Sequence, residues 1–447
     1  MRNRRFFALL ALFAVLTLVA AACSNDDGGG GTETGGGGET GTQTGGAVDC
    51  ESDEFGCVEI AAGEPITLGT LQAISGDTAS LGTDQVNGVM LAIDYLDGTL
   101  DGTNGQLLGH DVEIVQEDDL CSAEGGQQGA TALAANEAIV AVVGTSCSSA
   151  ALGVADQIFS DKGILLISSS NTNPGLTSEE AHQPFYLRTA HNDKIQGAIV
   201  ADFALQELGA TTAATINDES PYADGLAAAF RDWFTANGGE IVGQEAIQST
   251  DTDFQPLLTS LADAAPDVLY FPDFNPACAL IAQQAREIMP DTELIGSDGC
   301  LATDFLETAG DAAEGVYASS PDLSTFAGGE AYQDLIRQYN ETFGQAPPSV
   351  FHAHAFDAAN ILFDAIESVA QDDGGNLTIP RTALKDAIFA TNGYQGITGT
   401  ISCTPLGDCA TDVTIGIFEA PDWPVEGGNP DAAAVYSDTK TLEEVSV

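Results

Sequence analysis

Two loops rich in hydroxyl groups are the stretches of this sequence best suited to hold a small charged molecule. They span residues 144–149 (GTSCSS) and 168–174 (SSSNTNP), and each follows a short apolar segment typical of a buried β-strand. Free backbone amides at a helix start, with the hydroxyls of Ser148 and Ser149 beside them, form a neutral cradle suited to a carboxylate. The same residue types also serve as helix caps and turns, so each loop alone has two interpretations. Two such loops in one half of the chain favour binding.

Catalysis and metal binding fit these residues less well. A nucleophilic Cys147 or Ser148 would need a partner base, and the surrounding loop lacks the Gly-x-Ser-x-Gly pattern of a nucleophile elbow. His352 and His354 are two residues apart, a spacing that does not share a helix face, and the cysteines show neither a CxxC pair nor zinc-finger spacing. Residues 71–76 do not supply the glycine pattern of a dinucleotide site. We therefore expect no enzymatic activity, no metal and no cofactor.

The charge balance narrows the choice of partners. The chain has 447 residues, of which 12 are basic and 67 acidic, so its formal net charge is −55. Such a polyanion repels the phosphates of nucleic acids and the anionic headgroups of lipids, and the acidity is best explained as a hydrated surface. The length suits two domains with appendages.

The N-terminus carries an export signal. Three arginines among the first five residues precede an apolar run over 6–22, which ends in three alanines directly before Cys23. This ending is typical of a bacterial lipobox, in which Cys23 is acylated after residues 1–23 direct export, although an uncleaved signal anchor is the alternative. The general secretory and twin-arginine routes both remain open. Residues 24–64 form a flexible tether, since 28–46 is built almost wholly from Gly, Thr and Glu.

Eight cysteines remain after Cys23, and an even count in an exported chain indicates disulfides. Their spacing favours two local pairs, Cys50–Cys57 and Cys403–Cys409, because short loops close most readily. The other four cysteines are not paired by spacing alone.

Strand and helix patterns alternate along the body of the chain and predict an α/β fold with two parallel sheets of four or five strands each. In the first half, strands are expected at 66–72, 111–116, 138–143 and 163–167, with helices at 84–96, 123–136 and 149–160. The pattern restarts after Arg188, with strands at 212–216, 240–247, 268–271 and 293–295 and helices at 193–208, 223–236, 255–262 and 277–289. Long helices at 326–343 and 354–370 follow, and the chain returns to strand at 393–401 and 413–419.

Several of these stretches resemble the leucine/isoleucine/valine-binding family of ABC-transporter solute receptors, in the family's order from about residue 65 to residue 419. The stretches are 68–76, Gly82, 87–88, 118–121, 144–149, 162–168 and 172–177 in the first half, and 217–226, 253–254 and 310–315 in the second. The resemblance implies a periplasmic binding protein of type I, with two Rossmann-like lobes joined by three crossings near 188–190, Ser320 and Ala410. Lobe 1 would comprise 65–189 and 321–410, and lobe 2 would comprise 190–320 and 411–447.

The resemblance also implies the remaining disulfides and a set of ligand-binding residues. Cys121 and Cys147 match the family's cysteine pair, which leaves Cys278 and Cys300 for each other. By position, the carboxylate of an amino acid would meet Ser148 and Thr172, with Ser149 beside them and backbone from Ser170 and Asn171. Tyr222 would close from lobe 2, Phe274 would lie over the ligand, and Asp298 would hold the ammonium. None of the five histidines is implied near this site.

Two departures from the family bear on the ligand. Phe274 stands where the family often has tyrosine, and Leu81 stands where an aromatic residue is expected. Asp298 is also one methylene shorter than the family's glutamate. A roomier amino acid, a short amide or another small metabolite is therefore an alternative to a branched-chain amino acid.

Together these features predict a monomeric, extracytoplasmic lipoprotein that binds an amino acid, most simply a branched-chain one, and delivers it to ABC permease subunits. A ligand-sensing receptor of the same fold is the alternative. The protein would be tethered to the outer face of the cytoplasmic membrane, in a periplasm or at the cell surface, through the lipid on Cys23 and through no other contact.

Overall fold

The computed structural model describes residues 50–447 except 51, 323–329, 426–427, 430–431 and 446–447. The expected lipidation site Cys23, the signal peptide and the first part of the tether lie outside these residues. So do the first four residues of the helix predicted at 326–343. Among the described residues, no helix is both long enough and apolar enough to span a bilayer.

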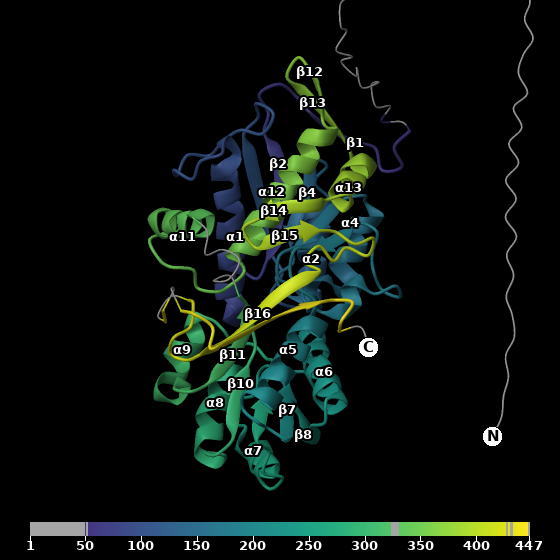
Figure 1. The fold of residues 1–447 in the computed structure, drawn as a ribbon. Coiled ribbons are helices and arrows are strands. Elements are labelled where there is room, and N and C mark those ends of the chain that lie inside the picture. Colours follow the sequence, from purple (N-terminus) through teal and green to yellow (C-terminus); the bar gives the residue numbers. More distant parts are fainter. Residues whose placement is uncertain (1–49, 51, 323–329, 426–427, 430–431, 446–447) are drawn as a thin grey trace, which may run out of the picture. The chain divides into compact units, whose positions relative to one another are not determined.

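The first half of the chain forms a parallel five-stranded sheet with the order β3-β2-β4-β5-β6 (Figure 1). Its strands are β2 (Ile66–Gln72), β3 (Val112–Asp118), β4 (Ile139–Gly144), β5 (Leu165–Ser168) and β6 (Tyr186–Arg188). The connecting helices are α1 (Ala79–Asp94), α2 (Ala123–Ala134), α3 (Ser148–Ala150) and α4 (Asp156–Asp161). All six residues of β4 are buried, because helices cover both faces of a parallel sheet.

A second sheet has seven strands in the order β17-β16-β11-β10-β9-β7-β8. Five are parallel: β7 (Thr212–Asn217), β8 (Glu240–Ala246), β9 (Val268–Tyr270), β10 (Glu293–Gly296) and β11 (Tyr317–Pro321). The other two, β16 (Asp412–Glu419) and β17 (Tyr436–Thr441), pair antiparallel with the β11 edge. The five parallel strands agree with the prediction of four or five, but the sheet is larger than expected, because two antiparallel strands from the far end of the chain extend it. Local sequence pattern carries no sign of that pairing.

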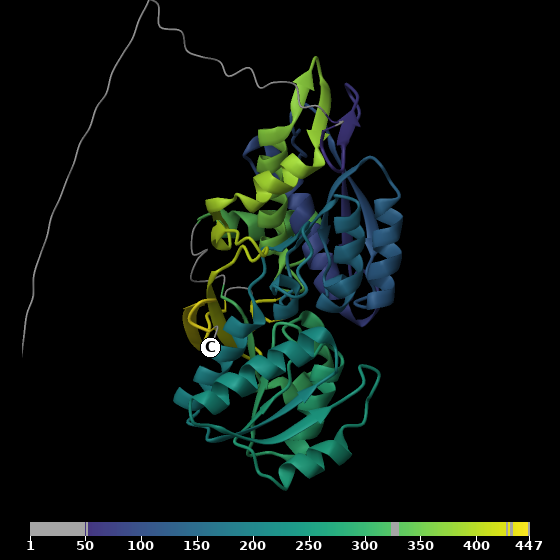
Figure 2. The same ribbon diagram turned by 90° about the vertical axis from the view of Figure 1, so that its right-hand side faces the viewer.

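Helices cover the second sheet on both faces (Figures 1 and 2). They are α5 (Asp193–Gln206), α6 (Pro221–Ala236), α7 (Gln255–Ala262), α8 (Ala277–Ile288) and α9 (Thr303–Ala309). Alternate residues of β9 face opposite sides, as a strand requires. Val268 and Tyr270 pack with α5 and α6, whereas Leu269 packs with α7 and α8.

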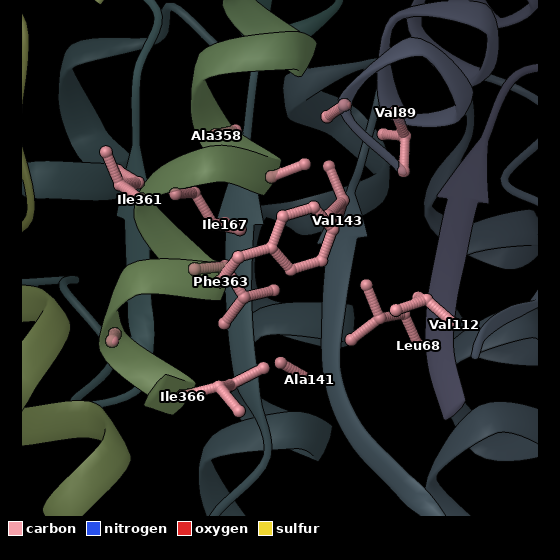
Figure 3. Close-up of a cluster of buried hydrophobic side chains, with 14 of the residues drawn as sticks. Leu68, Val89, Val112, Ala141, Val143, Ile167, Ala358, Ile361, Phe363 and Ile366 are labelled. Carbon is pink, nitrogen blue, oxygen red and sulfur yellow. The ribbon is translucent and has the colours of Figure 1, made fainter. Parts of the chain in front are cut away.

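Helix α12 (His352–Val369) packs on the first sheet although it begins 164 residues after Arg188, where the last strand of that sheet ends (Figure 3). Phe363 and Ile366 lie against Ala141 and Val143 of β4 in the hydrophobic cluster that Figure 3 shows. Helix α12 also crosses α1 at close range, since a Cβ on Gly88 would come within 2.2 Å of the backbone oxygen of His352. A return of the chain to the first sheet is what a fold with several crossings requires.

Smaller elements complete this half. They are α11 (Glu330–Phe343), α13 (Arg381–Phe389), the three-stranded sheet of β1 (Cys57–Ile60), β13 (Asn376–Pro380) and β12 (Gln371–Asp373), and the hairpin of β14 (Asn392–Gly396) and β15 (Gly399–Ser402). The single strand expected at 393–401 is thus a hairpin with a turn after Gly396.

The chain passes between the two sheets after β6, after β11 and after β15. The first and third passages touch, because the buried Arg188 places Nε 2.7 Å from Asp408 Oδ1 and the backbone N–H of Cys409 donates to the Arg188 oxygen. Residue ranges for the two lobes stay a prediction. The described residues contain four disulfides, and they are the pairs expected above: Cys50–Cys57, Cys121–Cys147, Cys278–Cys300 and Cys403–Cys409.

Candidate ligand-binding site

The two hydroxyl-rich loops lie side by side at the carboxyl ends of β4 and β5, where parallel sheets place ligands. Ser148, the first residue of α3, is 2% exposed, and its Oγ accepts a hydrogen bond from the backbone N–H of Asn173 at 3.3 Å. Thr172 is fully buried. Its hydroxyl lies near the Asp193 carboxyl and lowers the pKa of that group, although the two do not reach good hydrogen-bond geometry. Ser148 and Thr172 therefore belong to one local site.

Three other candidates from these loops have their polar groups occupied by the protein itself. Ser149 Oγ donates to the Cys121 oxygen at 2.9 Å, and Ser170 Oγ donates to the Ser146 oxygen at 2.7 Å. The Asn171 amide donates to the Thr145 oxygen at 2.9 Å. The backbone N–H groups of Ser170 and Asn171 both donate to Ser168 Oγ. In this conformation the three residues hold the shape of the loops.

In the second half, Asp298 follows β10 and is 5% exposed. Its Oδ1 accepts hydrogen bonds from Gln196 Nε2 at 2.6 Å and from the Tyr222 hydroxyl at 2.9 Å. Burial raises the pKa of Asp298 to about 6, and these two hydrogen bonds limit the rise. The ring of Tyr222 lies 4.9 Å from that of Phe274, centroid to centroid. Three of the candidates from the second half are thus brought together.

The local sequence explains this arrangement. Ser220 caps α6 by accepting from the Ala223 N–H, which places Tyr222 in the first helical turn on its buried side. The tight turn after β10 needs Gly299, because a Cβ there would come within 2.5 Å of the Asp273 backbone oxygen. The Cys278–Cys300 disulfide then ties the turn that carries Asp298 to the helix that follows Phe274.

Asp193 and Gln196 belong to the site and were missed by the sequence analysis. Asp193 is fully buried, and neither of its carboxyl oxygens has a hydrogen-bond partner of good geometry in the described part of the chain. Burial and the nearby charge of Asp298 raise its pKa well above the ordinary value. The backbone N–H of Asp193 donates to the Thr172 oxygen at 3.0 Å, so Asp193 connects the hydroxyl loops with the surroundings of Asp298. The local sequence gave no signal for Asp193, because an acidic residue at the first position of a helix is usually exposed and interacts with the helix dipole.

His191 also lies closer than expected, since its Nε2 is 2.6 Å from Gln196 Oε1. Burial lowers the pKa of His191 to about 4, which keeps the ring neutral at ordinary pH. The described residues contain no group of three or more His, Cys, Asp or Glu side chains placed to hold a metal ion.

Hydrogen bonds between side chains and facing residues also link the halves directly. The Asn173 amide donates to the backbone oxygen of Pro221 at the start of α6, and Ser80 Oγ donates to Asp304 Oδ2 at 2.6 Å. The site can therefore offer hydroxyls to an anionic group from one side and carboxylates to a cationic group from the other. That is the chemistry needed to enclose a zwitterion.

Comparison with known proteins agrees with the fold. The chain matches the family model described as periplasmic binding protein over residues 65–408. It is 29% identical over 322 residues to a Leu/Ile/Val-binding protein of Rhizobium johnstonii, which covers 72% of this chain and 83% of the relative. It is 28% identical to a leucine-, isoleucine-, valine-, threonine- and alanine-binding protein of Pseudomonas aeruginosa, over 70% of this chain and 80% of the relative.

Solved structures give the same picture. The branched-chain amino acid transporter substrate-binding protein of Streptococcus pneumoniae, in complex with isoleucine, aligns with a TM-score of 0.71 at 25% identity, over 85% of this chain and 100% of that one. A leucine-binding protein from Thermotoga maritima shows the same fold, with a TM-score of 0.72 at 24% identity over 85% and 99% of the two chains. These relatives are solute-binding proteins and not enzymes. The chain belongs to the leucine/isoleucine/valine-binding family of type I periplasmic binding proteins.

Proposed function

We propose that this protein is the solute-binding lipoprotein of an ABC importer and that it captures an amino acid between its two lobes. The observation that carries the proposal is the buried carboxylate of Asp298, held by Gln196 and Tyr222 and neighboured by Asp193. A buried carboxylate without a counter-charge is costly, and an ammonium group of the ligand would supply that charge.

The other end of the ligand would meet the hydroxyl loops. Ser148 and Thr172 lie at the carboxyl ends of β4 and β5, and the Thr172 hydroxyl has no hydrogen bond of good geometry in the described chain. A carboxylate is the group that hydroxyls and free amides of such loops stabilise best. Ser149, Ser170 and Asn171 would act by keeping these loops in position.

Capture would proceed by closure of the lobes about their three crossings. A ligand drives closure only through contacts that it gains in the closed state, and here those contacts come from Tyr222, Phe274 and Asp298. The names of the relatives favour a branched-chain amino acid. Phe274 replaces the tyrosine that the family often has, and Leu81 replaces an aromatic residue, so ligands with other side chains are also compatible with the site.

Export and tethering complete the proposal. The alanine run before Cys23 supports acylation of that thiol, and the family name supports a place outside the cytoplasm. The long acidic tether supports a body that acts at some distance from the membrane, and we propose that it does so as a monomer. Labelling of growing cells with a radioactive fatty acid tests the lipid directly: wild-type protein should become labelled and Cys23→Ser should not.

Calorimetry on the body from residue 47 onward, against the common amino acids, short amides and small carboxylates, tests the binding function. At least one amino acid should bind, and Asp298→Ala should weaken it by about a hundredfold or more because the ammonium loses its partner. Asp311→Ala removes an exposed carboxylate of the same lobe and serves as the control. Unchanged affinity in Asp298→Ala, with a native circular dichroism spectrum, would refute the assignment.

A further inference from the structure

A small cavity of about 20 Å³ lies beside Asp298 and is lined by residues of both halves of the chain. Leu81 and Phe274 form its apolar wall, and Ser80, Asn275 and Asp304 line the rest. If Asp298 holds the ammonium of an amino acid, this cavity is the space next to the ligand's Cα. It is therefore the place for the ligand's side chain, and its lining decides which side chains bind.

The lining is acidic. Asp77 and Asp304 join Asp298 around this one cavity, and none of the described residues that line it is Lys, Arg or His. The α-ammonium of a ligand offsets one carboxylate at most. The carboxylate of Asp304 then remains, half-buried at the start of α9, with a single hydrogen bond from Ser80 Oγ to its Oδ2. Its Oδ1 makes no hydrogen bond within the described part of the chain.

Asn275 indicates independently that this cavity lacks a hydrogen-bond donor. This residue is 7% exposed, and its Nδ2 donates to the Cys300 oxygen at 3.1 Å, which fixes the direction of the amide. Its Oδ1 is buried and receives no hydrogen bond from the described residues. A buried acceptor without a donor costs free energy, so a ligand that donates a hydrogen bond to this oxygen would be stabilised.

We infer that the side chain of the natural ligand ends in a cationic N–H donor, so that the cargo is a basic amino acid. Its methylenes would pack on Leu81 and Phe274, and its terminal nitrogen would donate to Asp304 and Asn275. A branched aliphatic side chain would offer a donor to neither acceptor and would leave the buried Asn275 Oδ1 without a partner. Sites built for N–H groups discriminate strongly against analogues that lack them. This inference rests on the proposed amino-acid function and narrows it.

The size of the cavity adds a mechanistic consequence. A volume of 20 Å³ is close to the space for one water molecule, so no such side chain enters while Ser80 and Asp304 are joined. The ligand's N–H would take over the place of the Ser80 hydroxyl on Asp304. The contact between the halves that exists in this structure would then be replaced by a contact through the ligand.

Matched ligand pairs test the inference at about pH 7.5, where Asp298 is ionised. Lysine is compared with norleucine and ornithine with norvaline, because each pair shares its carbon chain and differs by the terminal amine. Calorimetry should show the amine-bearing member binding at least about tenfold more tightly. In Asp304→Asn that advantage should fall below about threefold, because lysine loses a charged partner that norleucine never had.

Glu307→Gln is the matched control, since it makes the same change of charge at an exposed position of the same helix. It should leave the lysine advantage intact. Norleucine binding as tightly as lysine, or an undiminished lysine advantage in Asp304→Asn, overturns the inference but not the proposed function. If no member of either pair and no other amino acid binds to wild-type protein, the proposed function itself fails.

Discussion

Gln196 Nε2 lies 2.6 Å from Asp298 Oδ1, so the helix that begins just after the first passage between the sheets holds the carboxylate at the end of β10. The same nitrogen donates to Ser319 Oγ at 2.9 Å, and Gln196 Oε1 lies 2.6 Å from His191 Nε2. The whole amide group is thus engaged. Because Ser319 belongs to β11 and His191 to the first passage, Gln196 ties the ligand site to two of the three segments about which the lobes would move.

Removing this amide should weaken ligand binding. In Gln196→Leu, Asp298 loses a hydrogen bond that stabilises its ionised form and fixes its direction, so we expect affinity to fall by about tenfold. Calorimetry with the ligand identified for wild-type protein measures the change. Gln127→Leu, at an exposed position of α2, is the matched control and should bind as wild type. Equal affinities for all three proteins would show that Gln196 does not position Asp298.

Binding should depend on pH in a window set by Asp298. Burial raises its pKa to about 6 in the unliganded protein, and only the ionised carboxylate pairs with an ammonium group. Affinity should therefore be constant above about pH 7 and fall about tenfold for each pH unit below 6, because binding then requires loss of a proton. His191 stays neutral through this window, since its pKa is lowered to about 4. Titrations between about pH 5 and 8, with circular dichroism at each pH, check this, and a flat profile contradicts it.

Arg188 should be a large contributor to stability. It is fully buried, pairs with Asp408 and donates to the backbone oxygens of Asn171 and Asn173. Arg188→Met leaves a buried carboxylate without its partner and should lower the free energy of unfolding by about 3–5 kcal/mol.

The control is Arg337→Met, which breaks the exposed pair of Arg337 with Asp334 and should cost less than about 1 kcal/mol. Urea unfolding of both variants provides the measurement. A loss in Arg188→Met as small as that in the control would mean that the buried pair adds nothing to stability.

The Cys278–Cys300 disulfide should matter for both stability and binding. It closes a loop of 22 residues, so replacing both cysteines by alanine should cost about 3 kcal/mol. Because it joins the turn after Asp298 to the helix after Phe274, affinity for the ligand should fall as well. Replacing Cys50 and Cys57, which are seven residues apart at the start of β1, should cost less stability and leave affinity unchanged. Urea unfolding and calorimetry separate the two effects, and equal affinity losses in both variants would contradict this role.

The sequence by itself determined the features that depend on neighbours along the chain. The alternation of strands and helices follows from local periodicity, the hydroxyl loops are read directly as Ser, Thr and Asn after apolar runs, and the local pair Cys403–Cys409 follows from short loop closure. The resemblance to a known family then predicted that Asp298 and Tyr222 belong to the ligand site. In the structure, the Tyr222 hydroxyl donates a hydrogen bond to Asp298.

Only the tertiary structure decided the features that depend on residues far apart. Asp193 and Gln196 look like ordinary residues of a helix start until the fold buries them beside Asp298, more than 100 residues away. The antiparallel strands β16 and β17 joined a sheet whose other strands lie far earlier in the chain. Ser149, Ser170 and Asn171 carry suitable groups, but the fold uses those groups on backbone partners. Residue type determines which groups a side chain can bind. Burial and the nearest hydrogen-bond partners, which local sequence does not encode, determine which of its polar atoms stay available for a ligand.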